Sequence, residues 1–342
     1  MRVFVGLFLC TLLFSAPSAM ADPIPRILIL ASVDEVTELF KSEGFWGPVD
    51  PQETLVVPPL LTVVTVEEWK QEAAALPVSV KKDLFYRSLL PLILYANDLI
   101  AGQRMRLGEL SRQYTELGAL NQQDTADFLA LARHYKLLGQ KDAALPSKLK
   151  MEALLSELML RVDIVPPALA LGQGAYESGY GTSRFALEGN AYFGQWTYDG
   201  KGMKPKEKRA SKGNYGVAAY AWPLDSVESY MLNLNTHSAY TGLRKMRADI
   251  RASGSKVTGH DLAASLDRYS ERGQEYVDTL RGIMRFNELA VADSADLRAG
   301  PVVLLVNVEG AHDARVVAKE IDALRASGEL QQLIESMGID LN

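Results

Sequence analysis

Apolar residues recur at helical spacing through the middle of the chain. Between residues 78 and 160 they predict a succession of helices, because residues three and four apart share one face of a helix. Pro91 interrupts the first run and is expected to kink the helix or to begin a new segment. The more polar stretch 104–112 is expected to continue this helix into solvent. Ser147 is expected to cap a further helix over 148–161.

The two ends of the chain show a different pattern, in which short apolar runs alternate with proline or loop residues. Residues 63–66 are rich in valine and favour a strand, whereas 33–41 have helical spacing. Residues 293–300 are expected to form a linker, and the apolar run 301–308 predicts a buried strand followed by two helices. Because both ends contain valine-rich runs, we expect them to pair as one small α/β unit.

The first 21 residues have the features of a secretory signal peptide. Arg2 supplies a positive charge, residues 3–14 form a mostly apolar run, and residues 19–21 read Ala-Met-Ala, a cleavage pattern. The run is short for a membrane span, which needs about 20 residues. We therefore expect an exported protein of the periplasm or cell envelope, and an uncleaved anchor is the alternative.

Composition narrows the candidate chemistry. Cys10 is the single cysteine and lies in the leader, so cysteine catalysis and thiolate metal sites are excluded from the mature chain. The four histidines show no paired ligand spacing, and we expect neither a metal nor an organic cofactor. A net charge of −6 lacks the basic field of nucleic-acid-binding proteins. No integral membrane partner is indicated.

Length and pattern together suggest a mainly α (α+β) protein with several regions. A length of 342 residues suggests about two domains. The predicted regions are a leader (1–21), an N-terminal α/β segment (22–76), a helical region (77–162), a segment that carries the chemistry (163–290) and a C-terminal strand–helix segment (291–342).

One glutamate occupies an unusual position in the chemical segment. Asp163 is expected to cap a helix that begins with two prolines and ends at Gly179, which places Glu177 in its last turn between two tyrosines. The C-terminal end of a helix disfavours negative charge, and apolar neighbours raise a carboxyl pKa. A raised pKa suits a general acid near neutral pH. The alternative is a solvated surface glutamate.

The residues that follow suggest a groove and a mobile lobe. In residues 189–198, aromatic side chains alternate with small and polar ones, which suits stacking on sugar faces but is also compatible with an ordinary hairpin strand. Residues 201–212 carry six basic side chains and one acidic side chain, between glycine-rich flanks. They suggest a lid over an anionic polymer, and a solvated loop is the alternative.

Four motifs in order carry a resemblance to a known family. They are GAYESGYGTSRFA, GNAYFGQW, LNTHSAY and YSERGQEYV. The chain resembles the glucosaminidase family of peptidoglycan hydrolases, glycoside hydrolase family 73, and is most similar to its Bax-like branch. The resemblance covers roughly residues 78–289. It implies a lysozyme-like fold, with a helical lobe and a small β-hairpin lobe formed by residues 195–217.

The resemblance also implies roles for individual residues. Glu177 matches the catalytic general acid, and Tyr276 matches the tyrosine that faces it across the cleft. Tyr180 replaces the usual wall tryptophan, and Tyr192 and Phe193 match an aromatic pair beside the cleft. The other residues expected to contact substrate are Asn190, Gln195, Trp196, Tyr240 and Tyr269.

A second carboxylate is less well defined by the sequence. The family often has one on the β-lobe, and Glu207 is the only acidic residue within 201–217, with Asp199 as the second choice. Glycosidases normally use two carboxylates, but some use the acetamido group of the substrate as the nucleophile. Retaining, inverting and substrate-assisted routes all stay open.

The sequence therefore predicts an exported β-N-acetylglucosaminidase that cleaves the glycan strands of peptidoglycan, with Glu177 as general acid. An N-acetylmuramoyl amidase-type wall hydrolase and a catalytically inactive cell-wall binding protein are the alternatives. A wall hydrolase needs restraint, so we also expect an unidentified regulatory protein.

Overall fold

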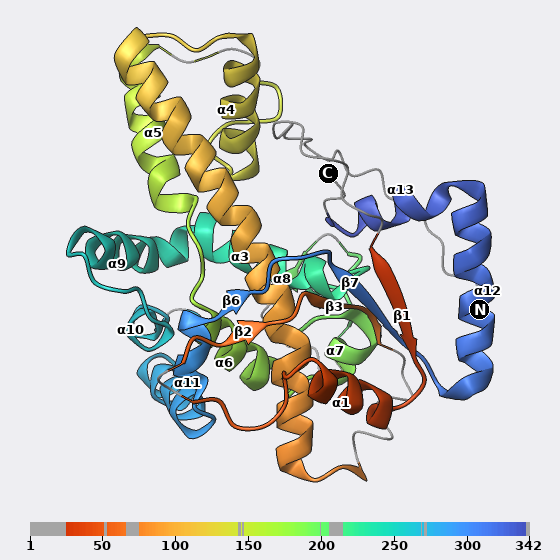
Figure 1. Ribbon diagram of the computed structural model, residues 1–342. Helices are drawn as coiled ribbons and strands as arrows, with labels where there is room; N and C mark the ends of the chain where they lie inside the picture. The colour runs from red at the N-terminus through yellow and green to blue at the C-terminus, as the bar shows by residue number, and fades with distance from the viewer. Residues whose placement is uncertain are drawn as a thin grey trace.

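The architecture comes from a computed structural model. It describes residues 25–50, 53–65, 75–142, 145, 147–198, 200–204, 215–267, 269 and 272–339, and the expected leader lies outside them. Within these residues the chain is mainly helical (Figure 1). It also carries three small sheets. The predicted mainly α class is thus confirmed.

The two ends of the chain build one parallel sheet. Its strands are β1 (Arg26–Leu30), β7 (Val303–Asn307) and β3 (Leu60–Thr65), in the order β1-β7-β3. The central strand β7 is almost wholly buried, as its unbroken apolar run predicted. The helices of this unit are α1 (Val33–Ser42), α12 (Gly310–Ser327) and α13 (Glu329–Ser336). The expected pairing of the two ends is confirmed.

Residues 293–300 are not the linker that the sequence suggested. The 3₁₀ helix η3 (Leu289–Ser294) enters this stretch, and β6 (Asp296–Leu297) then pairs in parallel with β2 (Val56–Val57). The polar composition suggested a linker, but a two-residue strand needs no apolar run and forms where its backbone finds a partner.

Helix α3 (Val78–Leu117) contributes side chains to two apolar cores. Figure 1 shows it running the length of the fold up to α4 and α5. It continues through Pro91, so the expectation of a new segment there is wrong. Its C-terminal half does not extend freely into solvent, because Leu107 and Leu110 are fully buried against α4 (Gln122–His134) and α5 (Lys148–Arg161). Among the described residues α3 alone is long and apolar enough to cross a membrane, but 72% of its most apolar window is buried within the fold.

Helix α6 (Pro167–Ser178) lies at the centre of the main core. It contacts α3, α10 (Gly259–Ala263), α11 (Gln274–Phe286) and η3. A Cβ at Gly174 would lie 2.9 Å from Leu89 Cδ2, so glycine permits the close approach of α3. The remaining helices of this core are α7 (Arg184–Gly189), α8 (Pro223–Thr236), η2 (Ser238–Tyr240) and α9 (Thr241–Ala252).

The start of α6 is held by one carboxylate from far along the sequence, Asp293, rather than by the expected cap. The helix begins after Pro166, and Asp163 instead accepts hydrogen bonds from Arg251 Nε and Nη2 at 2.8 and 2.7 Å. Asp293 takes the capping role, since its Oδ1 accepts from Ala168 N at 2.9 Å. Asp293 Oδ2 also accepts from Gly259 N at 2.7 Å, which ties α10 to the same point.

Glu228 on α8 is half-buried, and its carboxyl group has no hydrogen bond or ion pair to any described residue. It packs near the end of α13, where a Cβ at Gly338 would lie 3.4 Å from its Oε1. Burial, and then the charge of Asp225, raise the pKa of Glu228 to about 7. Its ionisation therefore opposes folding.

We expect Glu228→Gln to stabilise the protein at alkaline pH. Because the folded pKa is raised, the stability linked to the Glu228 proton is present below about pH 4.5 and is lost as the pH rises through about 7. The neutral amide avoids that loss, so the variant should gain about 1–3 kcal/mol at pH 8 and little at pH 4.5. Urea unfolding at both pH values measures the difference. Exposed Glu152→Gln is the control, and an equal gain at both pH values would contradict the assignment.

Candidate active site

Glu177 lies in the last turn of α6, as the sequence predicted. Gly179 ends the helix in the left-handed conformation, with φ of 58°. The Glu177 side chain is half-buried, and Tyr276 Oη of α11 donates a hydrogen bond to its Oε1 at 3.2 Å. Burial raises the pKa of Glu177 to about 7, although the Tyr276 hydrogen bond acts in the lowering direction. This carboxyl group can therefore hold a proton near neutral pH.

A series of buried side chains stands behind Tyr276. Gln173 Nε2 donates to Tyr276 Oη at 2.9 Å, and Tyr230 Oη donates to Gln173 Oε1 at 2.6 Å. All three side chains are completely buried. Sequence reasoning missed Gln173 and Tyr230, although Gln173 is one helical turn before Glu177 and so shares its face.

Aromatic rings surround the Glu177–Tyr276 pair. Tyr269 stacks in parallel on Tyr276, with ring centroids 5.6 Å apart, and Tyr176 meets Tyr276 edge-on at 5.3 Å. Tyr240 lies 5.8 Å from the Tyr269 ring. The structure thus brings three of the predicted site residues, Tyr240, Tyr269 and Tyr276, into one cluster on the Glu177 side. Burial raises the pKa of Tyr240, Tyr269 and Tyr276, which keeps their hydroxyl groups protonated.

The backbone at Gly194 passes directly against the carboxyl group. Gly194 has φ of 60°, and an added Cβ would lie 3.2 Å from Glu177 Oε2. The same loop is fixed by Tyr269 Oη, which donates to Phe193 O at 2.9 Å. Gly194 is a further site residue that sequence reasoning missed, and its position at the end of the GNAYFG motif was the available signal.

Three residues predicted to contact substrate make side-chain contacts within the protein. Asn190 Nδ2 donates to Tyr220 O and Ala221 O, Gln195 bridges Tyr220 Oη and Ser229 O, and the buried Phe193 ring stacks on Tyr230 at 3.9 Å. These contacts secure the loop after α7 to α8.

Tyr180 and Tyr192 line a separate cavity of about 70 Å³. Its walls include Phe85 and Leu89 of α3 and Asn307 of β7, and Glu177 is not part of its lining. Tyr180 has φ of 58°, and its ring packs edge-on against Phe85. The structure therefore places these two tyrosines together on the wall of this cavity.

The predicted hairpin lobe is present as a short antiparallel pair. Its strands are β4 (Trp196–Thr197) and β5 (Gly216–Val217). Trp196 is 46% exposed, and its ring lies 5.0 Å from that of Tyr215. Glu207 and Asp199 lie outside the described residues. Among the residues that the structure does describe, no group of three or more His, Cys, Asp or Glu side chains could hold a metal ion.

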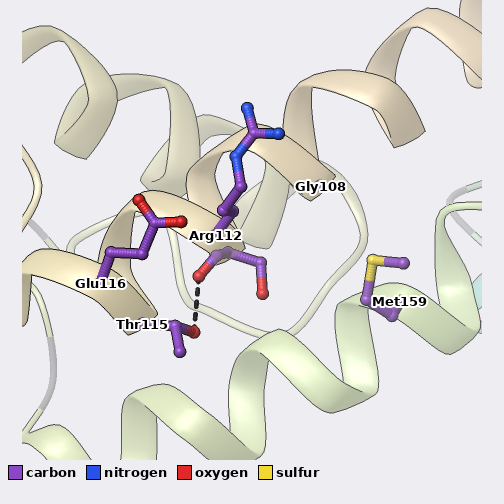
Figure 2. A pocket seen from close by; sticks show the side chains of 6 residues that line it. Gly108, Arg112, Thr115, Glu116 and Met159 are labelled. Carbon is purple, nitrogen blue, oxygen red and sulfur yellow. Dashed lines mark hydrogen bonds between the residues drawn. The ribbon is translucent and has the colours of Figure 1, made fainter.

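A larger hollow, of about 380 Å³, lies elsewhere on the molecule (Figure 2). It is formed between α3 and Met159 of α5, and Thr115 Oγ1 within it donates to Ser111 O at 2.8 Å. Its lining contains no aromatic ring on which a sugar could stack. The volume of this hollow therefore does not make it the better substrate site.

Comparisons of the sequence with known proteins found a matching family model and a similar protein. The glucosaminidase family model, described as mannosyl-glycoprotein endo-beta-N-acetylglucosaminidase, matches residues 153–289. The chain is 32% identical over 212 residues to Protein bax of Escherichia coli (strain K12), and the alignment covers 62% of this chain and 72% of that protein. No solved structure was found to match the chain.

The chain therefore belongs to the glucosaminidase family and is similar within it to Protein bax. The matched region begins in α5 and ends where η3 starts, so it contains α6, the hairpin lobe and α11. Membership of this family supports the assignment of the protein as a glycosidase related to peptidoglycan.

We expect Tyr276→Phe to raise the pKa of Glu177 above its value of about 7. The variant removes the hydrogen that Tyr276 donates to the carboxylate and leaves the desolvation in place. A ¹³C NMR titration of the glutamate carboxyl groups, assigned with Glu177→Gln, measures the change. Tyr176→Phe is the control, because the Tyr176 hydroxyl accepts from Arg272 and has no hydrogen bond to Glu177. An unchanged Glu177 pKa in Tyr276→Phe would show that the hydrogen bond is unimportant.

Proposed function

We propose that this protein is a β-N-acetylglucosaminidase that cleaves the glycan strands of peptidoglycan, with Glu177 as its general acid. The observation that carries the proposal is the Glu177 carboxyl group, whose pKa is raised to about 7 at the end of a buried helix inside a glucosaminidase domain. A proton donor with a pKa near the working pH is what protonation of a glycosidic oxygen requires.

The proposed reaction is hydrolysis of a glycosidic bond. Glu177 gives its proton to the glycosidic oxygen as the bond from that oxygen to the anomeric carbon breaks. A water molecule or the acetamido group of the substrate attacks the anomeric carbon, and water finally supplies the new hydroxyl group. Tyr276 holds the carboxyl group and stabilises the anion that remains after proton transfer.

Sugar binding is proposed to use two solvent-accessible aromatic side chains, one next to Glu177 in the sequence and one on the hairpin lobe. Tyr176 is partly exposed beside Glu177 on α6, and Trp196 is exposed on the hairpin lobe. Aromatic rings expose apolar faces on which sugar rings can stack. Glu207, in the sequence between β4 and β5, is proposed as the second carboxylate because no other acidic residue lies within 201–217.

The place of action is proposed from the sequence alone. Residues 1–21 have the pattern of a secretory signal peptide, and peptidoglycan lies outside the cytoplasm. We therefore propose an exported enzyme of the periplasm or cell envelope, restrained by a regulatory protein.

We expect residues 22–342 to release new N-acetylglucosamine reducing ends from purified peptidoglycan. Glu177→Gln should lower the rate by roughly 10²–10⁴-fold, because the amide cannot donate the proton. Mass spectrometry of the products, with reducing-end chemistry, identifies the cleaved bond. Glu152→Gln, an exposed position on α5, is the matched control.

Other products would replace this proposal. N-acetylmuramic acid reducing ends would move the cut to the other glycosidic linkage, and free stem peptides would indicate an amidase. Wall binding by both proteins without any product would indicate a binding protein.

We expect the wild-type rate to fall as the pH rises through about 7. The general acid works only while protonated, and the Glu177 pKa of about 7 sets the upper limb of the pH profile. Initial rates between pH 4.5 and 9 test this expectation. An upper limb that begins only above pH 9 would assign the acid to another group.

A further inference from the structure

Three buried side chains from three helices stand in series behind the Glu177 carboxyl group. Tyr230 of α8 donates to Gln173 Oε1 at 2.6 Å, and Gln173 Nε2 of α6 donates to Tyr276 Oη at 2.9 Å. Tyr276 of α11 then donates to Glu177 Oε1 at 3.2 Å. Every bond in the series points in the same direction, toward Glu177.

The direction follows from what each group can donate. A glutamine amide accepts at its oxygen and donates at its nitrogen, whereas a tyrosine hydroxyl has a single hydrogen to donate. Because Tyr230 donates its hydrogen to the Gln173 oxygen, the amide nitrogen faces Tyr276. Tyr276 then accepts from Gln173, so its own hydrogen is left for Glu177. If the amide were turned over, its oxygen would take the Tyr276 hydrogen, and only a lone pair would face the carboxyl group.

Packing holds the series in this arrangement. The Tyr230 ring stacks on the buried Phe193 ring, with centroids 3.9 Å apart and planes 8° apart. Gln173 and Tyr230 have no exposed surface, so bulk water cannot replace a partner that turns away. The Tyr276 ring is itself held between Tyr269 and Tyr176.

We infer that Gln173 is a positioning residue, oriented by Tyr230, that directs the Tyr276 hydroxyl hydrogen toward Glu177. This inference rests on the proposed function for its catalytic meaning, since it concerns the same carboxyl group. None of the residues behind Tyr276 needs to touch substrate. These residues affect how readily Glu177 loses its proton. The hydrogen bond that they enforce stabilises the carboxylate once it has given its proton to the leaving group.

Tyr230→Phe tests the inference most directly. The variant removes one hydroxyl group and keeps the ring that stacks on Phe193, so the Gln173 amide becomes free to turn over. We expect the Glu177 pKa to rise and the upper limb of the kcat/KM profile to move to higher pH. We also expect kcat at the optimum to fall by roughly tenfold, the equivalent of one hydrogen bond, with KM unchanged.

The second core offers a matched control. Tyr135 is also buried and donates to a glutamine side chain, Gln103 Oε1, at 2.6 Å, but it belongs to the core formed by α3, α4 and α5 and not to the core around α6. Tyr135→Phe should cause a similar loss of stability and no change in the pH profile. Gln173→Glu is the second variant: its carboxylate would accept the Tyr276 hydrogen and should raise the Glu177 pKa further.

The ¹³C NMR titration of Glu177 and the pH profile of kcat/KM keep this inference separate from the proposed function. The ¹³C NMR titration of Glu177 needs no activity, so it tests the series even if the protein cleaves no glycan. A raised Glu177 pKa in folded Tyr230→Phe and Gln173→Glu supports the inference. Unchanged Glu177 titration, or a uniform loss of rate with an unmoved pH limb as for a merely structural role, overturns it.

Discussion

The burial of α6 is the constraint on which the rest of the site depends. Nearly every residue of this helix is enclosed, and only its last turn reaches the surface. The enclosure requires close backbone approach, because a Cβ at Gly259 of α10 would lie 2.5 Å from Leu169 N and one at Gly172 would lie 3.0 Å from Met284 Cγ. A carboxyl group at the end of such a helix is desolvated by the packing itself, which is the main cause of the raised Glu177 pKa.

The other end of α6 is fixed by charged groups that the terminal segments help to supply. Asp293 caps the helix from η3, immediately before β6 joins the N-terminal β2. Arg247, fully buried, donates to the carbonyl groups of Asp163 and Ile164 just before the helix. Buried charges are tolerated only with such dense hydrogen bonding. The small α/β unit is therefore continuous with the framework of the site rather than an appendage to it.

Features of the fold that depend on neighbouring residues could be predicted from the sequence, and features that depend on residues far along the chain could not. The end of α6 at Gly179 and the placement of Glu177 could be predicted because they depend on neighbours within one helical turn. The capping role of Asp293 could not, because its partner Ala168 is 125 residues away. Likewise Asn190 and Phe193 belong to a motif that suggested substrate contact, but their partners on α8 and in the preceding loop turn their side chains toward the protein. The second core was not predicted because the C-terminal half of α3 has few apolar residues. Leu107 and Leu110 form a core only where α4 and α5 pack over them.

The chemistry of the site depends on a balance between two opposing effects on one proton. Desolvation by the α6 packing favours the neutral carboxyl group, and the hydrogen donated by Tyr276 favours the carboxylate. The proposed role of Glu177 as a general acid needs both effects, because such a group must release its proton in one step and recover it before the next turnover. With desolvation alone, the group would hold its proton too firmly, and a fully solvated glutamate would have lost the proton at neutral pH before substrate arrived. In the proposed reaction the partners of Tyr276 matter for this reason: by fixing the direction of a single hydroxyl hydrogen, these buried residues set how readily Glu177 gives up its proton.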